Sequence, residues 1–339
     1  MDNKDKISNR LKPFSMHVNP ALFERATDEE KQELVIMRKS TSLWRDAIRR
    51  FRRNPFAMVA LILIIVLILF AFVGPLFMPY DYDQFNDGHE NQHPSSIHPF
   101  GTDKFGRDML VRNMYGAQIS LSIGMLAAVL TVIIGSIYGS VSGFAGGKVD
   151  NVMMRFIDII YALPELLVVI LLSVTLKGPL EDLMANSPIL KGLSSLGPAF
   201  FAMLIVFALL YWGTMARIVR GEVLRIKEQE YILAAKALGA SGSRTIRRHI
   251  LPNCVGPIIV TATLQIPAAI FVESFLSFIG LGISAPRASL GSMVSDAING
   301  VYSFPERILF PAILIMLIIL GFNTVGDALR DVLDPRMKK

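Results

Sequence analysis

The stretch FAMVALILIIVLILFAFVGPLFM, residues 56–78, runs for 23 positions without a charged side chain. An α-helix of this length spans roughly 34 Å, which is enough to cross the ~30 Å hydrocarbon core of a bilayer. Backbone polar groups that meet lipid must be satisfied within the segment, and a helix does this. The stretch therefore predicts a transmembrane helix, in keeping with a mean hydropathy of +0.48.

Five further predominantly apolar segments follow it. The six expected spans are Phe56–Met78, Ile119–Gly143, Phe156–Leu176, Leu196–Ile218, Pro257–Leu281 and Ile308–Val325. The first is too long, and is preceded by too many polar residues, to be a cleaved signal peptide, so we expect it to stay in the membrane. The sequence predicts an all-α, polytopic membrane protein with six transmembrane helices.

The distribution of Lys and Arg predicts the orientation of these spans. Of the 34 basic residues, 27 fall in the N-terminal segment, the second and fourth connections and the tail, and 7 fall in the other three connections. Basic connections stay preferentially in the cytoplasm, so both termini are expected there. The same distribution accounts for the formal charge of +6 and argues against a nucleic-acid partner.

Three parts follow from this topology. Residues 1–55 form a cytoplasmic segment, residues 56–328 the membrane domain, and residues 329–339 a cytoplasmic tail. Near the end of the first part, Trp44, Ile48 and Phe51 fall on one helical face, with arginines elsewhere. This pattern predicts a helix lying at the membrane surface, or else a simple basic anchor for the first span.

The outer connection after the first span carries His89, His93 and His98. Pro94, Pro99 and nearby glycines prevent a helix from aligning these rings, so we expect no metal site. A single cysteine excludes an intramolecular disulfide and a cysteine-based zinc cluster.

Two carboxylates lie inside predicted spans, Glu165 and Glu273. A carboxylate in hydrocarbon is costly, so each should face the bundle interior, a partner or water. They either line a translocation path or hold two helices together by hydrogen bonds. Asp158, close to the inner end of its span, is expected to pair with Arg155 one turn away.

The cytoplasmic connection at about residues 217–253 carries the most specific pattern. Glu222–Leu238 has no Pro or Gly and predicts a helix, on which a narrow stripe repeats at helical spacing. The stripe consists of Tyr231, Ala234, Ala235 and Leu238. Gly239 is placed to end this helix, and Ser243 to cap a second short one. Small side chains let a partner approach closely, although an ordinary basic loop is the alternative.

The run from Glu230 to Gly239, followed by Leu251-Pro252, resembles the coupling loop of ATP-binding-cassette (ABC) importer permeases. In that family the loop, called the EAA loop, docks in a groove of the ATPase subunit. Ala234-Ala235, the glycine and Leu-Pro keep the family spacing, whereas Leu233 replaces the family's Glu and His249 its Ile. The resemblance implies that Glu230 and the stripe residues carry the coupling.

Other segments are similar to the dipeptide/oligopeptide branch of the family. They are residues 98–108, 146–158, 276–282 and 326–336. This resemblance implies a C-type permease subunit in the plasma membrane of a prokaryote. Its partners would be a second, homologous permease, two ATPase subunits that hold ATP and Mg, and an extracytoplasmic peptide-binding protein.

The chain itself is expected to bind no cofactor and to have no catalytic residue. It contains no phosphate-binding loop of the type Gly-x-x-x-x-Gly-Lys-Ser/Thr, so ATP hydrolysis would take place in another chain. Three alternatives remain at this point: a nickel or glutathione importer of the same family, an ion-coupled secondary transporter, and a membrane scaffold.

Overall fold

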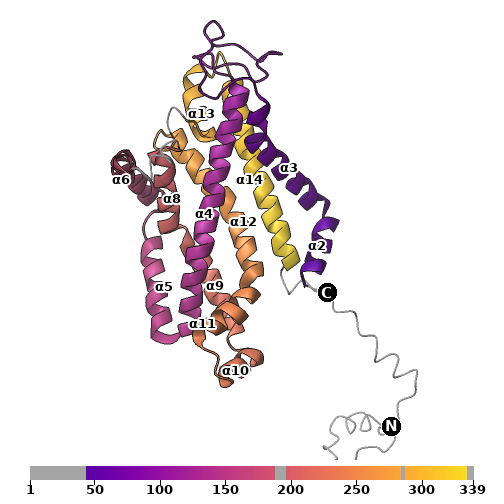
Figure 1. Ribbon diagram of the computed structural model, residues 1–339, viewed down its shortest axis with the longest axis vertical. Coiled ribbons are helices and arrows are strands. Elements are labelled where there is room, and N and C mark those ends of the chain that lie inside the picture. The colour runs from indigo at the N-terminus through magenta and orange to yellow at the C-terminus, as the bar shows by residue number, and fades with distance from the viewer. Residues whose placement is uncertain (1–42, 188–195, 284–286, 334–339) are drawn as a thin grey trace, which may run out of the picture. The chain divides into compact units, whose positions relative to one another are not determined.

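The computed structural model describes residues 43–187, 196–283 and 287–333. The described residues from Ala47 onward cluster into one compact unit, which is helical, with an isolated antiparallel bridge between Thr102 and Asp108 (Figure 1). The predictions for residues 1–42, for residues 188–195 of the outer connection and for the last six residues lie outside the described part.

The described helices follow one another with short connections. In chain order they are α2 (Leu43–Arg53), α3 (Pro55–Phe72), η3 (Gly74–Phe77), α4 (Met109–Ala145), α5 (Gly147–Tyr161), α6 (Glu165–Asn186), α8 (Pro198–Leu210), α9 (Trp212–Ile226), α10 (Glu230–Ala237), α11 (Gly242–Thr245), the π-helical turn η5 (Ile246–Ile250), α12 (Leu251–Phe278), α13 (Leu290–Ala297), η6 (Ile298–Gly300) and α14 (Glu306–Leu333).

Five helical segments of the described part are long and apolar enough to cross a membrane. They are α3, α4, α8 with α9, the continuous run from α11 to α12, and α14. A sixth crossing results if α5 and α6, which meet at an angle of 81°, count as one broken span. The prediction of an all-α, multi-pass membrane protein is confirmed.

The third span is not the continuous helix predicted over Phe156–Leu176. Helix α5 ends at Tyr161 and α6 begins at Glu165, after Pro164. A proline lacks the backbone N–H for the helical ladder and disfavours helical geometry at the residue before it, so the chain bends here. Helix α6 then continues to Asn186, which places ten residues of the expected outer connection in a helix.

Other boundaries also differ from the prediction. Helix α4 begins at Met109, ten residues early, because the Asp108 carboxylate accepts a hydrogen bond from the Val111 N–H at 2.9 Å and caps the helix. Helix α14 runs from Glu306 to Leu333, so the described start of the tail is helical. The short α13, opened by a Ser289–Ser292 capping box, was not predicted.

The centre of the bundle is the close packing of α4 against α9 (Figure 1). Gly135, Gly139 and Gly143 recur every four residues along α4 and face α9. A Cβ atom at Gly135 would lie 2.6 Å from the Met215 Cβ, and one at Gly139 would clash with the Ala216 carbonyl. These glycines let the backbones of α4 and α9 approach each other closely, which is the role that small residues have in other pairs of membrane helices.

Helix α2 confirms the predicted helix before the first span. Trp44 and Ile48 are exposed on it, whereas Ala47 is buried. Asn54 then caps α3, since its side chain accepts a hydrogen bond from the Ala57 N–H at 3.2 Å, and Pro55 occupies the first helical position.

Candidate functional site

The predicted cytoplasmic helix is two helices joined by a turn. Helix α9 ends at Ile226, residues 227–229 turn, and α10 begins at Glu230, whereas the sequence predicted one helix over Glu222–Leu238. The Gln229 N–H donates to the Ile226 carbonyl at 3.0 Å and closes the turn. Nothing in the local propensity marks this break, because it is set by how the two helices pack.

Ile232 anchors α10 to the membrane domain. Its side chain is fully buried in a cluster with residues of α9, η5 and α12, among them Val223, Ile250 and Cys254. Fully burying a side chain of this size contributes about 1.5–3 kcal/mol. Sequence reasoning missed this residue because Ile232 lies beside the stripe rather than on it.

The C-terminus of α10 is held by a Schellman motif. Gly239 adopts φ +85°, the Gly239 N–H donates to the Lys236 carbonyl at 2.9 Å, and the Ala240 N–H donates to the Ala235 carbonyl at 3.0 Å. The predicted role of Gly239 as the helix-ending residue is confirmed. The cap of the next helix is Ser241 and not Ser243, because the Ser241 hydroxyl accepts from the Arg244 N–H at 3.4 Å.

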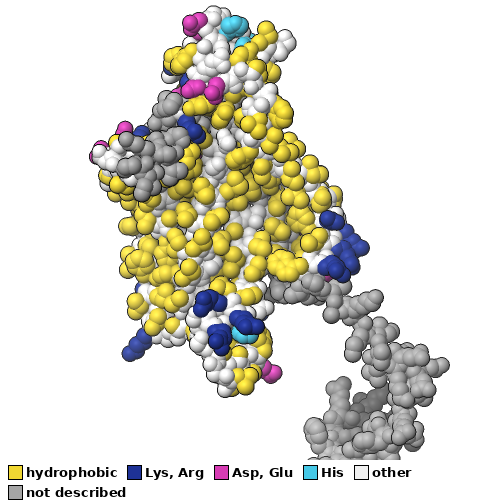
Figure 2. Space-filling model, viewed as in Figure 1, with side chains coloured by type: hydrophobic (Ala, Val, Ile, Leu, Met, Phe, Trp, Pro, Cys, Tyr) yellow, Lys and Arg dark blue, Asp and Glu magenta, His cyan; other side chains and the backbone are white. Residues whose placement is uncertain are grey.

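The predicted stripe faces outward from the described part of the chain. Leu238 is 90% exposed and Tyr231 is 48% exposed, Ala234 is also exposed, and Ala235 is half-buried. Leu233 adds a further exposed apolar side chain. Figure 2 shows basic side chains next to these hydrophobic ones at the lower tip; Arg244, Arg247 and Arg248 of this region are all exposed. The stripe and Leu233 are called the α10 surface below.

Helix α4 also holds the loop in place. The Lys227 ammonium donates to the Gly143 carbonyl at the end of α4 at 2.9 Å. The Lys236 ammonium lies 5.0 Å from the centroid of the Phe144 ring. These contacts join the α10 region to the inner end of the glycine-packed α4–α9 pair.

Two ion pairs connect α9 to α5. Arg220 donates to both carboxylate oxygens of Asp150 at 2.5 Å, and Asp150 also accepts from the Ser142 hydroxyl. One turn earlier in α9, Arg217 pairs with Asp158 at 2.9 Å. The predicted partner of Asp158, Arg155, is therefore wrong: the pair forms between helices rather than along one.

Glu165 lies at the break between α5 and α6, at the edge of a groove of about 390 Å³. The Tyr211 hydroxyl donates to the Glu165 carboxylate at 2.5 Å. Tyr161, Thr214 and Gln265 add polar groups to the wall of the same groove. Glu165 is exposed in the chain, so it can meet a ligand, a partner or water.

Glu273 has the opposite surroundings. It is fully buried in α12, and its carboxylate accepts hydrogen bonds from Ser120 of α4 and from Ser277, both at 2.8 Å, and from Ser274 at 3.3 Å. Of the two alternatives stated for this residue, the geometry favours a hydrogen bond that holds helices together. The structure thus separates two carboxylates that the sequence treated alike.

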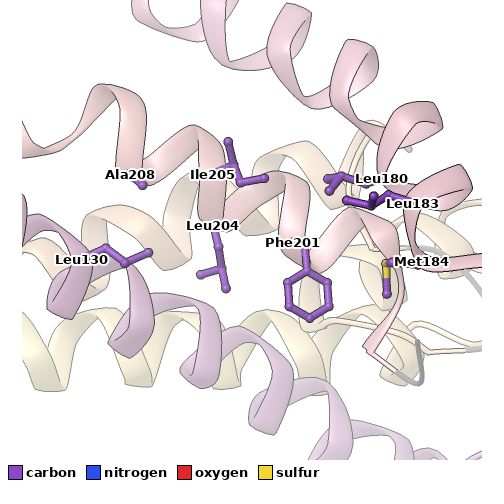
Figure 3. Close-up of a pocket in the computed structure, with 8 residues that line it drawn as sticks. All are labelled: Leu130, Leu180, Leu183, Met184, Phe201, Leu204, Ile205 and Ala208. Atoms are coloured by element: carbon purple, nitrogen blue, oxygen red, sulfur yellow. The ribbon is translucent and has the colours of Figure 1, made fainter. Parts of the chain in front are cut away.

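The pocket in Figure 3 is apolar throughout. Leucine, methionine and phenylalanine side chains of α4, α6 and α8 surround a space of about 340 Å³, among them Leu130, Met184 and Phe201. No polar group in its lining can orient a reacting molecule. In the described residues no three His, Cys, Asp or Glu side chains converge on a metal-sized site, and His98 instead pairs with the buried Asp108 at 2.7 Å.

Comparison with known proteins adds independent findings. The model of the family described as binding-protein-dependent transport system inner membrane component matches residues 131–339, and that of the N-terminal TM domain of oligopeptide transport permease C matches residues 42–94. The oligopeptide transport system permease protein OppC of Bacillus subtilis is 48% identical over 318 residues, which cover 94% of this chain and 98% of that protein.

Two other relatives give the same picture. The dipeptide transport system permease protein DppC of Bacillus subtilis is 44% identical over 90% of this chain and 89% of its own length. OppC of Escherichia coli is 40% identical over 87% of this chain and 92% of its own length.

Proposed function

The chain belongs to the family of binding-protein-dependent transport system inner membrane components, and on this premise we propose that it forms half of a translocation path for di- and oligopeptides. It is a membrane-spanning component of an ABC importer. The observation that carries the peptide assignment is its identity of 40–48% with oligopeptide and dipeptide permeases over most of both chains. Membership of this family disfavours an ion-coupled transporter or a scaffold.

In this proposal the α10 surface docks on an ATPase subunit. Its support is an outward-facing stripe with two alanines at its centre, carried on a rigid base that Ile232, Gly239 and the contacts to α4 form. Two ATPase subunits hold ATP and Mg, and this chain supplies no group to hydrolysis. A second, homologous permease closes the path, and an extracytoplasmic binding protein delivers the peptide.

The coupling follows from how α10 is attached. Because α10 is fixed to α9, and α9 is fixed to α4 and α5 by close packing and two ion pairs, a displacement of α10 moves several helices together. The movement that accompanies ATP-driven closure of the ATPases is thereby transmitted to the broken α5–α6 span, where Glu165 lines the groove.

The decisive experiment places a bulky residue on the stripe of the reconstituted importer. Ala235→Trp should abolish ATPase association and peptide uptake while the chain still inserts, because Trp cannot fit where a partner approaches a small side chain. Ala235→Ser, which keeps a small side chain at the same position, is the matched control and should retain uptake. Wild-type uptake by the Ala235 variant would remove the coupling assignment.

The proposed location is the plasma membrane of a prokaryote, with both termini in the cytoplasm. A single cysteine replacing Ser187, at the end of α6, should react with an impermeant reagent added outside the cell, in a Cys254→Ala background. One replacing Ser241 should react only after the cells are opened. Reversed labelling would overturn this orientation and the docking site with it.

A further inference from the structure

A second groove, of about 470 Å³, is lined by residues of the segment before α4, of α4 itself, and of the region from α13 to the start of α14. Figure 1 shows α13 and the start of α4 at the same end of the helical bundle. Under the proposed topology this is the outer side of the membrane. Four of its lining side chains are cationic and two are anionic, which gives the groove a net charge of +2. They are Lys104, Arg107, Arg112 and Arg307, against Asp103 and Asp296.

Two of these arginines are enclosed in the protein. Arg112 is 5% exposed and Arg307 is 8% exposed, and long cationic side chains are rarely buried to this extent unless they are paired. Their pairing within the described residues is incomplete. The Arg112 Nη1 and the Arg307 Nε have no hydrogen-bond acceptor, and a buried donor without an acceptor is destabilising.

The nearby acids do not neutralise both guanidinium groups. Asp103 receives its short contact from Arg107, at 2.7 Å, and lies 3.8 Å from the Arg112 Nε. Arg307 donates to the neutral Asn91 amide at 3.0 Å and stacks over Phe304 at 3.9 Å. Each buried arginine also interacts with a second acid at longer range, Asp296 for Arg112 and Glu306 for Arg307, so neither is closely paired with a carboxylate of its own.

The other residues that line the groove indicate what the rest of the ligand is like. Met109, Met293 and Ala297 are buried apolar residues, and Phe304 adds an aromatic face. A groove with an apolar floor and a few convergent polar groups, at this volume, fits a molecule of roughly dipeptide size. Planar guanidinium groups match the two oxygens of a carboxylate.

We propose that this groove binds the terminal carboxylate of a short peptide on the outer side of the membrane, with the side chain of the last residue on the apolar floor. The assignment rests on the proposed peptide function and names a capture site for the same substrate. It is distinct from the Glu165 groove, which lies at the α5–α6 break.

The test uses two exposed positions whose isosteric changes act in opposite directions. Asn299→Asp adds a negative charge to the groove wall, and Asp296→Asn removes one, without altering the shape of either side chain. The probes are alanyl-phenylalanine and its C-terminal amide, titrated by calorimetry into the purified full chain in lipid nanodiscs. Inorganic phosphate serves as a competing anion.

We expect the free acid to bind about tenfold or more tightly than the amide, since the amide loses a charge-assisted contact. At low salt Asn299→Asp should weaken binding of the acid by roughly threefold, and Asp296→Asn should strengthen it by a similar factor. Asn186→Asp and Asp182→Asn make the same charge changes outside the groove and should leave affinity unchanged. Arg112→Lys, which retains the charge and loses the planar fork, should weaken the acid alone.

Equal affinity for acid and amide, or a shift in the same direction for both groove variants, would overturn the assignment. Phosphate that displaces the acid at equal concentration would also overturn it, in favour of a phosphate or lipid-headgroup site. Peptide uptake by the reconstituted importer tests the proposed function separately. Peptide uptake combined with equal binding of acid and amide would contradict only the carboxylate site in the groove. Carboxylate binding without peptide uptake would support that site and contradict the proposed function.

Discussion

The α10 surface and the surroundings of Glu273 both reverse the usual distribution of side chains, in opposite ways. At α10, apolar side chains are exposed, with Leu238 at 90%. In α12, a carboxylate is fully buried within the membrane domain. The buried carboxylate of Glu273 is compensated inside the chain, because three serine hydroxyls donate to it. The exposed apolar side chains of α10 have no such compensation in the described residues.

This difference separates a structural role from an interaction role. A buried polar group that is fully hydrogen-bonded stabilises one arrangement of its own chain. Exposed apolar groups on a rigidly held helix contribute little to their own chain and are available to a partner. Changes at Glu273 should therefore act on the isolated chain, whereas changes on the α10 surface should act on the assembled importer.

The largest expected effect is that of Glu273→Leu. The variant leaves three hydroxyl groups in the protein interior without their acceptor, at a cost of about 2–4 kcal/mol. Thermal unfolding of the purified chain should show a lower midpoint, and uptake of every peptide should fall with protein abundance. Glu273→Gln, which keeps the shape and one acceptor, should lose much less. Normal stability combined with a peptide-selective defect in the Leu variant would return Glu273 to the translocation path.

Leu238→Glu should have the next largest effect, and only in the complex. A charged group on the apolar stripe should weaken association with the ATPase subunit by about tenfold or more, because it is desolvated on docking. The unfolding midpoint of the isolated chain should not change, since the side chain is exposed. Copurification of the subunits gives the first quantity and thermal unfolding the second. A large loss of stability in the isolated chain would contradict the comparison.

Gly239→Val tests the support of the α10 surface. A β-branched residue at φ +85° should cost about 1–2 kcal/mol locally and misplace the stripe. Peptide uptake should fall while the amount of inserted protein is unchanged. Gly239→Asn, which tolerates this backbone conformation better, should retain more uptake than the Val variant. Equal uptake by both variants would show that the Schellman motif is not needed for coupling.

Glu165→Gln should give the smallest effect and adds a third case to the comparison. Its carboxylate is exposed in a groove and, among the described residues, accepts from one donor, Tyr211. Loss of the charge should change uptake by roughly two- to threefold, and more for peptides with a free amino end than for blocked ones, because only the free amine is charged. Measuring both kinds of peptide at matched protein level makes the distinction. Identical effects on both would give Glu165 a structural role.

Much of the fold could be predicted because the signals are local in the chain. Long apolar runs decide which segments enter the membrane, and Gly239 marks a helix end. The α5–α6 break was missed although Pro164 was visible, because Pro is tolerated in many membrane helices and only the surrounding packing shows whether the chain bends. The partner of Asp158 was missed for a related reason, since Arg217 is 59 positions away along the chain.

The sequence by itself determined the fold class, the α10 stripe and the family resemblance, because helical periodicity, glycine backbone freedom and motif spacing are properties of neighbouring residues. Only the tertiary structure decided which of two intramembrane carboxylates is enclosed by serines and which borders a groove. It also decided that Arg112 and Arg307, nearly two hundred positions apart, share an under-neutralised groove. Burial and charge compensation depend on contacts between distant segments, and these form only when the helices pack.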